Sequence, residues 1–211
     1  MFYETRDNRH GLPHDPFKAI VAPRPIGWIS TRTGSGAVNL APYSFFNAIS
    51  DQPKLVMFSS AGMKDTATFA IESGEFVANL ATEALAEAVN RSSAPAPRGE
   101  SEFAIAGLTE APCILVAAPR VAESPAALEC KVTEWFHPKS LEGDASANVV
   151  VIGEVVGIHL DESIIKDGIV DMTLARPLAR LGYFDYSAAS QVFQMRRPKA
   201  PDASDIPPRH G

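Results

Sequence analysis

Short extended segments recur along most of this 211-residue chain, and their recurrence restricts the fold more than any other feature of the sequence. They are rich in β-branched and aromatic residues and fall at residues 26–31, 37–41, 54–60, 75–81, 113–118, 127–136 and 148–160. Pro119, Pro125 and Pro138 separate the later segments. Only residues 66–73 and 82–90, the second opened by Thr82 as a capping residue, have a convincing helical pattern. Because a doubly wound parallel sheet needs alternating strands and helices, the sequence predicts a mainly β fold with flanking helices.

The first two extended segments form a predicted hairpin, since the Thr-Gly-Ser-Gly run at residues 33–36 supplies a turn between them. A further strand, residues 54–60, ends in two hydroxyl side chains and leads into a polar helix start at Lys64. The first turn of a helix presents backbone N–H groups that favour an anion. Ser59, Ser60, Lys64 and Thr66 therefore form a candidate anion site, with an ordinary capped helix as the alternative.

Size and composition indicate one soluble domain. A chain of this length can bury a substantial core, and its 45% hydrophobic and 21% charged residues are ordinary for a globular protein. No apolar run approaches the roughly 20 residues of a membrane helix, and the polar N-terminus lacks the pattern of a secretory signal. We expect a cytoplasmic protein without a membrane span.

Several classes of function are disfavoured by residue patterns. The net charge of −6, without a lysine or arginine run, argues against a nucleic-acid partner. Ser35 lacks the spacing of a hydrolase nucleophile elbow, and no Gly-x-Gly-x-x-Gly turn for a dinucleotide is present. The five histidines are scattered, which predicts no metal site. Cys113 and Cys130 lack zinc spacing, so we interpret both as small core residues, with a redox pair as the alternative.

Two other segments leave their interpretation open. Residues 91–102 are rich in Ser, Ala and Pro and predict an exposed loop, either a passive connection or one that closes over a site. His159 ends a strand and either has a structural role or reaches the nicotinamide side of a flavin.

Beside the candidate anion site, residues 43–47 (Tyr-Ser-Phe-Phe-Asn) can present backbone polar groups to the edge of a planar ring. Phe45 and Phe46 point to opposite sides of a strand, so at most one faces a ligand and the other belongs to the core.

Several ordered blocks resemble the flavin reductase-like, FMN-binding split-barrel family. They are RPIGWIST at 24–31, NLAPYSFFNAIS at 39–50, KDT at 64–66, EFVANL at 75–80, APRVAESP at 118–125 and VIGEVV at 151–156. The resemblance covers roughly residues 18–187, which leaves 1–17 as an N-terminal extension and 188–211 as a Pro-rich C-terminal tail. The part of this tail from residue 196 onward is expected to be mobile or to lie on a partner subunit.

The resemblance implies an antiparallel Greek-key β-barrel and a homodimer with FMN at or near its interface. The residues that it assigns to cofactor binding are Arg24, Ser44, Phe45, Phe46, Asn47, Ser59, Ser60, Lys64, Asp65, Thr66, Asn79, Arg180 and Tyr183. Ser44–Asn47 would line the flavin ring and ribityl chain, Ser59, Ser60, Lys64 and Thr66 would hold the phosphate, and Asn79 would approach from a neighbouring strand. Arg24, Arg180 and Tyr183 would contact the flavin edge or the other subunit, the alternatives being a surface salt bridge for Arg180 and core packing for Tyr183.

The resemblance also implies the reaction. The leading hypothesis is an NAD(P)H:flavin oxidoreductase that passes hydride from NADH or NADPH to FMN and electrons onward to oxygen, free flavin or a monooxygenase partner. The flavin supplies the chemistry, so no catalytic side chain is expected. The alternatives are a non-enzymatic FMN-binding electron carrier and a dimeric barrel that binds no flavin.

Overall fold

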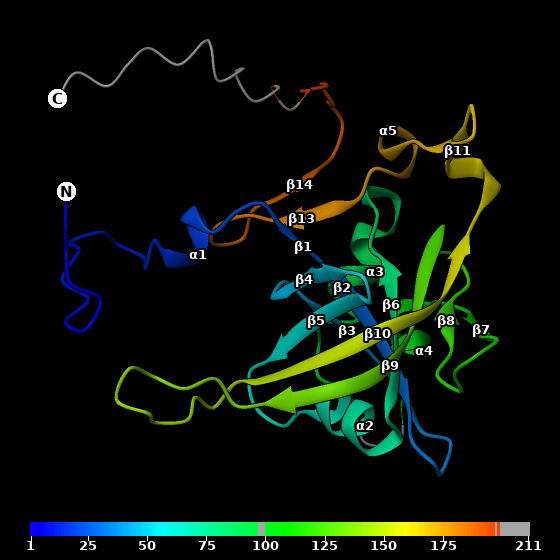
Figure 1. Ribbon diagram of the computed structural model, residues 1–211, viewed down its shortest axis with the longest axis horizontal. Helices are drawn as coiled ribbons and strands as arrows, with labels where there is room; N and C mark the ends of the chain where they lie inside the picture. The colour runs from blue at the N-terminus through cyan, green and yellow to red at the C-terminus, as the bar shows by residue number, and fades with distance from the viewer. Residues whose placement is uncertain (97–99, 197, 199–211) are drawn as a thin grey trace, which may run out of the picture.

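The computed structural model describes residues 1–96, 100–196 and 198. Its largest sheet has seven strands, in the order β3 (Val38–Tyr43), β2 (Gly27–Arg32), β6 (Glu75–Leu80), β9 (Ala126–Phe136), β10 (Val149–Leu160), β5 (Lys54–Ser60) and β4 (Phe46–Asp51) (Figure 1). Neighbouring strands in this sheet are antiparallel throughout. The predicted mainly β, antiparallel fold is confirmed.

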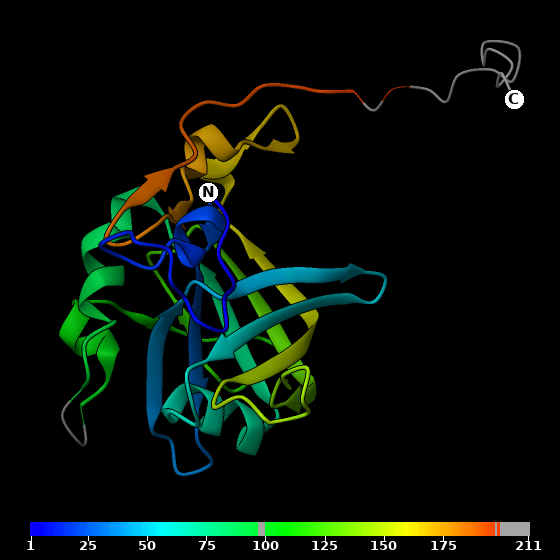
Figure 2. The same ribbon diagram turned by 90° about the vertical axis from the view of Figure 1, so that its left-hand side faces the viewer.

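Chain connectivity forces this sheet to curl. β3 and β4 are its two edge strands, yet only Ser44 and Phe45 separate them in the sequence. The edges must therefore approach each other, and Figure 2 shows the resulting half-barrel. At the seam, the place where β3 leads into β4, the Ser59 amide donates to the Phe45 carbonyl at 2.8 Å. The Phe46 ring lies so close to Gly27 that a Cβ at that glycine would be 2.4 Å from it. Ser44 and Phe45 thus sit where the half-barrel closes.

Small sheets and short helices surround the half-barrel. The sheets are β1 (Arg24–Pro25) with β13 (Leu178–Arg180) and β14 (Tyr186–Ala188), β7 (Glu110–Ala111) with β8 (Arg120–Val121), and β11 (Ile165–Lys166) with β12 (Ile169–Val170). The helices are α1 (Phe17–Ile20), α2 (Asp65–Ser73), α3 (Ala86–Arg91), α4 (Glu102–Ala106) and α5 (Met172–Ala175), with 3-10 turns η1 (Glu83–Leu85) and η2 (Glu162–Ile164).

The core lies on both faces of β2. Successive side chains of a strand point to opposite faces, so Trp28 and Ile29, both fully buried, enter two different hydrophobic clusters. The cluster of Ile29 includes Phe58 and Phe76, whose rings meet edge to face with centroids 5.3 Å apart. α2 adds its small residues to the same cluster. A strand buried on both faces explains the continuous apolar character of this segment.

Two local predictions are wrong. Residues 113–118 form bends instead of a strand, because their amides donate to carboxylates: Ile114 to Glu129 at 2.9 Å and Ala118 to Glu75 at 3.2 Å. The predicted helix at 82–90 is divided into η1 and α3, and Thr82 makes no side-chain capping hydrogen bond.

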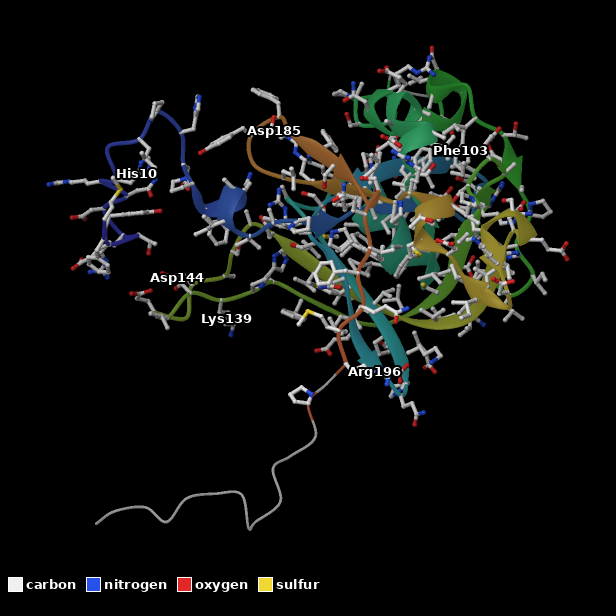
Figure 3. The ribbon with its side chains drawn as sticks, turned by 90° about the horizontal axis from the view of Figure 1, so that it is seen from above. His10, Phe103, Lys139, Asp144, Asp185 and Arg196 are labelled. Atoms are coloured by element: carbon white, nitrogen blue, oxygen red, sulfur yellow. The ribbon has the colours of Figure 1, made fainter. Side chains whose placement is uncertain are left out.

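The N-terminal segment lies beside the tip of the β9–β10 hairpin. Arg6 and Glu142 form an exposed ion pair at 3.3 Å. Viewed from above, His10 lies on the same side of the molecule as Lys139 and Asp144 of that hairpin (Figure 3). Among the described residues no helix is long and apolar enough to cross a membrane. The predicted tail lies largely outside the described residues.

Gly74, at the end of α2, has a left-handed backbone conformation whose effect on stability can be tested. Gly74 follows α2 with a φ of 74°, and a Cβ there would meet no atom within 4 Å. We expect Gly74→Ala to lower the free energy of unfolding by about 1–2 kcal/mol, since the left-handed conformation penalises an L side chain. Gly34→Ala is the matched control, because Gly34 has equal space and no left-handed φ. Equal urea midpoints for the two variants would contradict this explanation.

Candidate functional site

A cleft of about 540 Å³ brings together predicted residues from both ends of the domain. Its lining residues are His14, Asp15, Phe17, Lys18, Arg24, Ser44, Arg180 and Tyr183. The cause is strand pairing: β1 and β13 are antiparallel neighbours with Arg24 directly opposite Arg180. Three cationic residues and one carboxylate, that of Asp15, therefore line one cleft in a chain whose net charge is −6. Such a local concentration of positive charge favours an anionic ligand.

Arg24 organises the wall of this first cleft. Its side chain is buried, and its guanidinium donates to the backbone carbonyls of Lys18 and Val21 and, at 2.9 Å, to that of Leu181. Burial, together with the nearby Arg180, lowers the pKa of Arg24 from its ordinary value. Arg24 thus ties the N-terminal segment to the end of β13.

Arg180 is held by aromatic residues. Its guanidinium lies 4.5 Å from the centroid of the Tyr186 ring and donates to the Tyr186 hydroxyl and to the Tyr183 carbonyl. Tyr183 has a left-handed φ of 55°, and its ring lies 5.4 Å from the ring of His14. Among the described residues Arg180 forms no salt bridge. It lines the first cleft and also a pocket that includes Phe184 and Tyr186.

In residues 44–47, around the seam, some side chains line a cleft and others pack into the core. Ser44 lines the first cleft, whereas Phe46 packs against the hydrophobic cluster of Ile29. Phe46 is therefore the core member of the Phe45–Phe46 pair. Asn47 is exposed, and its side-chain oxygen accepts from the Ala48 amide at 2.9 Å.

A second cleft of about 430 Å³ lies at the start of α2. Its lining residues are Asn39, Ala41, Pro42, Tyr43, Lys64, Asp65, Thr66, Ser92, Ser93, Ala94, Pro95, Ala96 and Glu102. Part of the predicted 91–102 loop thus forms one wall, while residues 97–99 of that loop lie outside the described residues and Glu102 opens α4. The Trp28 indole donates to the Ser92 hydroxyl at 2.9 Å and holds this wall to the core.

A buried polar network supports the second cleft. The Thr66 hydroxyl donates to the side-chain oxygen of Asn39, whose amide donates to Glu102 at 3.0 Å. The Leu40 amide donates to the other carboxylate oxygen of Glu102, also at 3.0 Å. The predicted hydroxyls are engaged as well: Ser60 donates to the Gly62 carbonyl at 2.7 Å. The Ser59 hydroxyl accepts from Asn148 at 3.2 Å.

Lys64 and the helix start remain available for a ligand. Lys64 is the N-cap residue of α2, and no side chain caps this nine-residue helix. Its ammonium forms no ion pair within the described part of the chain. Backbone N–H groups and one ammonium at a helix N-terminus are donors suited to a phosphate, so the residues present fit the phosphate of FMN.

Asn79 lies apart from both clefts. Its buried amide donates to the Trp28 carbonyl at 2.9 Å and to the Ser30 hydroxyl at 3.0 Å. Its side-chain oxygen accepts from the Val121 amide at 2.8 Å. These bonds join β2, β6 and β8, and they use both N–H groups and the oxygen of the Asn79 side chain.

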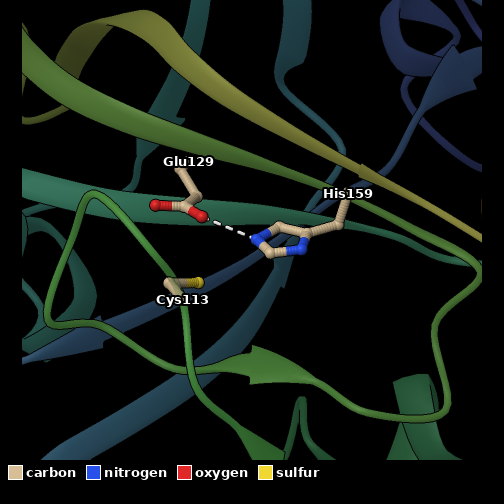
Figure 4. A group of neighbouring side chains, drawn as sticks. All are labelled: Cys113, Glu129 and His159. Carbon is tan, nitrogen blue, oxygen red and sulfur yellow. Dashed lines mark hydrogen bonds and ion pairs between the residues drawn. The ribbon is translucent and has the colours of Figure 1, made fainter.

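One cluster of chemical groups was absent from the sequence-based prediction. Cys113, Glu129 and His159 converge, and His159 Nε2 lies 2.6 Å from Glu129 Oε1 (Figure 4). Burial opposes the charged form of Glu129, but hydrogen bonds from the Ile114 and Leu115 amides and from His159 hold its pKa below its ordinary value. Burial, reinforced by Glu129, raises the pKa of Cys113 to about 11.

The sequence held one signal for this cluster. Glu129 interrupts the otherwise apolar run 126–130 of a strand, where a charged side chain must find partners if it faces inward. The cysteine interpretation is confirmed for Cys130, which is fully buried, while Cys113 is partly buried against a small cluster; both are free thiols.

Comparison with solved structures defines the class of fold. A protein from Shewanella frigidimarina with a split-barrel domain superposes with a TM-score of 0.77 at 23% identity, covering 93% of this chain and 94% of that chain. The curled sheet is therefore a split barrel. Nitrilotriacetate monooxygenase component B from Bacillus cereus superposes with a TM-score of 0.83 at 29% identity, covering 92% of this chain and 98% of that chain.

The sequence comparisons then give the family. Residues 21–185 match the family described as flavin reductase like domain, and the chain belongs to it. It is thus a flavin-related oxidoreductase. An uncharacterized protein of Halalkalibacterium halodurans is 40% identical over 183 residues, which span 84% of this chain and 87% of the relative.

Proposed function

We propose that this protein is an FMN-binding NAD(P)H:flavin oxidoreductase, with residues 18–187 as its flavin-binding domain. The observation that carries the proposal is the uncapped start of α2, where Lys64 faces a cleft without an ion-pair partner among the described residues. The chemistry that FMN supplies when bound is acceptance of hydride from NADH or NADPH and delivery of electrons to oxygen, free flavin or a monooxygenase partner.

The protein's own residues bind and orient the cofactor in this proposal. Lys64 and the amides of Asp65 and Thr66 hold the phosphate, and Ser59 and Ser60 shape the turn that leads to them. Ser44, Phe45 and Asn47 lie along the flavin ring and ribityl chain, while Phe46 supports this segment from the hydrophobic cluster of Ile29. The buried Thr66–Asn39–Glu102 network fixes the helix start.

The first cleft adds the remaining proposed contacts. Arg180 and Tyr183 meet the flavin edge, and Arg24 keeps their strand in place. Asn79 acts through the sheet, since its amide fixes β2 beside β6. Positive charge along this cleft would also attract the phosphates of a nicotinamide nucleotide.

The proposal includes a cytoplasmic homodimer that completes the flavin site. Alternate residues on the second half of β10 are exposed and apolar, namely Val156, Ile158 and Leu160. An exposed apolar stripe on a long strand supports an interface between subunits. A monooxygenase component as electron acceptor is supported by the likeness to component B.

A steady-state assay tests the reaction. Purified protein with added FMN is expected to oxidise NADH or NADPH, which is measured as a loss of nicotinamide absorbance. Reactions that lack FMN or protein should stay slow. Failure to oxidise either nucleotide in the presence of FMN would refute the reductase proposal.

The same preparation distinguishes the alternative carrier function. Flavin that stays with the protein through gel filtration, with no NAD(P)H turnover, would favour an electron carrier. A preparation that neither retains nor binds FMN would refute both flavin-based functions. Spectra before and after anaerobic addition of NADH show whether bound flavin is reduced.

A further inference from the structure

Three side chains of metal-ligating type converge away from both clefts. Cys113 comes from the bends before β8, Glu129 from β9 and His159 from β10 (Figure 4). One ligand atom from each residue lies within 4.8 Å of the others. Glu129 is only 1% exposed at its side chain, while His159 is 22% exposed, so the cluster is reached from one side.

Strand register explains how the carboxylate and the imidazole meet. On the paired strands Glu129 stands opposite Gly157, and His159 stands opposite Ala127. A Cβ at Gly157 would lie 3.4 Å from the Glu129 carboxyl carbon. Because the glycine leaves the space over the carboxylate open, the His159 side chain two residues along can reach it.

The carboxylate is held in place before any ligand arrives. The amides of Ile114, Leu115 and Val116 donate to its two oxygens at 2.9, 2.6 and 3.1 Å. These bonds also fix the backbone directly after Cys113, which keeps this residue beside the carboxylate. Such support from surrounding hydrogen bonds is typical of protein metal sites.

The local charge favours a cation. The charged groups that act on Cys113 are the carboxylates of Glu129 and Glu75 and the guanidinium of Arg120. With the thiolate formed, the group carries two excess negative charges and matches a divalent ion. One sulfur, one nitrogen and one oxygen donor form a set that suits Zn²⁺.

We propose that Cys113, Glu129 and His159 bind one Zn²⁺ ion and leave a fourth position for water. The cation takes the place of the proton between His159 Nε2 and Glu129 Oε1, and the bound imidazole is neutral with its one proton on Nδ1. Any further imidazole proton and the Cys113 thiol proton pass to solvent as the Zn–N and Zn–S bonds form. No redox change occurs. Tetrahedral zinc keeps a nitrogen and an oxygen ligand about 3.3 Å apart, so His159 Nε2 and Glu129 Oε1, which lie 2.6 Å apart, must separate slightly when the ion binds. The Cys113 sulfur, within 4.8 Å of both atoms, then completes the set. The bound ion would link the segment 113–118 to β9 and β10.

Metal titration of the full chain, stripped with a chelator, tests this proposal. We expect one Zn²⁺ per chain by competition with a chromophoric chelator. Co²⁺ should give the visible absorption bands of a tetrahedral ion and a thiolate charge-transfer band. Both are recorded in difference spectra, in which flavin absorption cancels. Zinc at about 100 times its Kd should raise Tm by roughly 5–10 °C. Absence of stoichiometric binding would overturn the proposal, whatever the outcome of the reductase assay.

Single variants locate the ion. Cys113→Ser and His159→Gln should each weaken zinc binding more than about 100-fold, and Cys113→Ser should abolish the charge-transfer band. His137→Gln is the control, because His137 is an exposed imidazole after β9 whose Nδ1 faces backbone carbonyls. Circular dichroism verifies that each variant is folded. Zinc binding that survives both ligand substitutions, or that is lost equally in His137→Gln, would assign the metal to other residues.

Discussion

Replacement of Glu129 by alanine is expected to lower the free energy of unfolding of the metal-free protein by about 3–5 kcal/mol. The carboxylate is buried and accepts hydrogen bonds from three backbone amides and from His159. Alanine would leave these donors without an acceptor inside the protein, and each unsatisfied donor carries a desolvation cost. Urea unfolding in the presence of a chelator measures the effect.

Glu134→Ala is the matched control for this prediction. Glu134 lies on the same strand but is exposed, so its replacement should change stability by less than about 0.5 kcal/mol. Native-state hydrogen exchange adds a local measure: the amides of Ile114, Leu115 and Val116 should lose protection in Glu129→Ala and keep it in Glu134→Ala. Equal stability of the two variants would show that Glu129 is not the anchor of the bends.

The elements that follow local sequence patterns were predictable. The strand at 54–60 is mostly apolar, and the 26–41 hairpin has β-branched residues on either side of a Gly-rich turn. Both are confirmed. α2 begins at Asp65, one residue before its predicted start, and ends at Ser73 as predicted. Each of these signals lies within a few neighbouring residues, where hydrophobic periodicity and turn chemistry act.

Features set by distant residues could not be predicted from local patterns. The segment 113–118 has strand-like composition, yet its amides bind carboxylates of Glu75 and Glu129 instead of another strand. The opposition of Arg24 and Arg180 follows from the pairing of β1 with β13. Local propensity carries no information on such partners, and tertiary contacts override it.

The candidate site shows the same division. Ordered motifs indicated Ser44, Lys64 and Arg180, and each lines one of two clefts. The motifs did not predict that the Thr66 hydroxyl would be engaged by Asn39. A residue type at the right spacing can point toward a ligand or toward a neighbour, and only packing decides between them.

Replacement of Lys64 by alanine is expected to weaken FMN binding by about 1–3 kcal/mol, or roughly 5- to 150-fold in Kd. Lys64 supplies an ammonium at the uncapped start of α2, where it would meet the phosphate with the helix amides. Fluorescence titration of FMN with flavin-free protein measures the change. Lys54→Ala is the control, since Lys54 is an exposed lysine at the start of β5, paired with Asp51 at 3.0 Å.

Riboflavin separates a phosphate contact from a general loss of structure. It has the flavin ring and ribityl chain of FMN but no phosphate, so Lys64→Ala should leave its affinity almost unchanged. Lys64→Arg keeps the positive charge and should retain most of the FMN affinity. If Lys64→Ala weakened FMN and riboflavin equally, the lysine would act on the shape of the site. If FMN affinity were unchanged, the phosphate would have to bind elsewhere, with the cationic cleft of Arg24 and Arg180 as the next place to test.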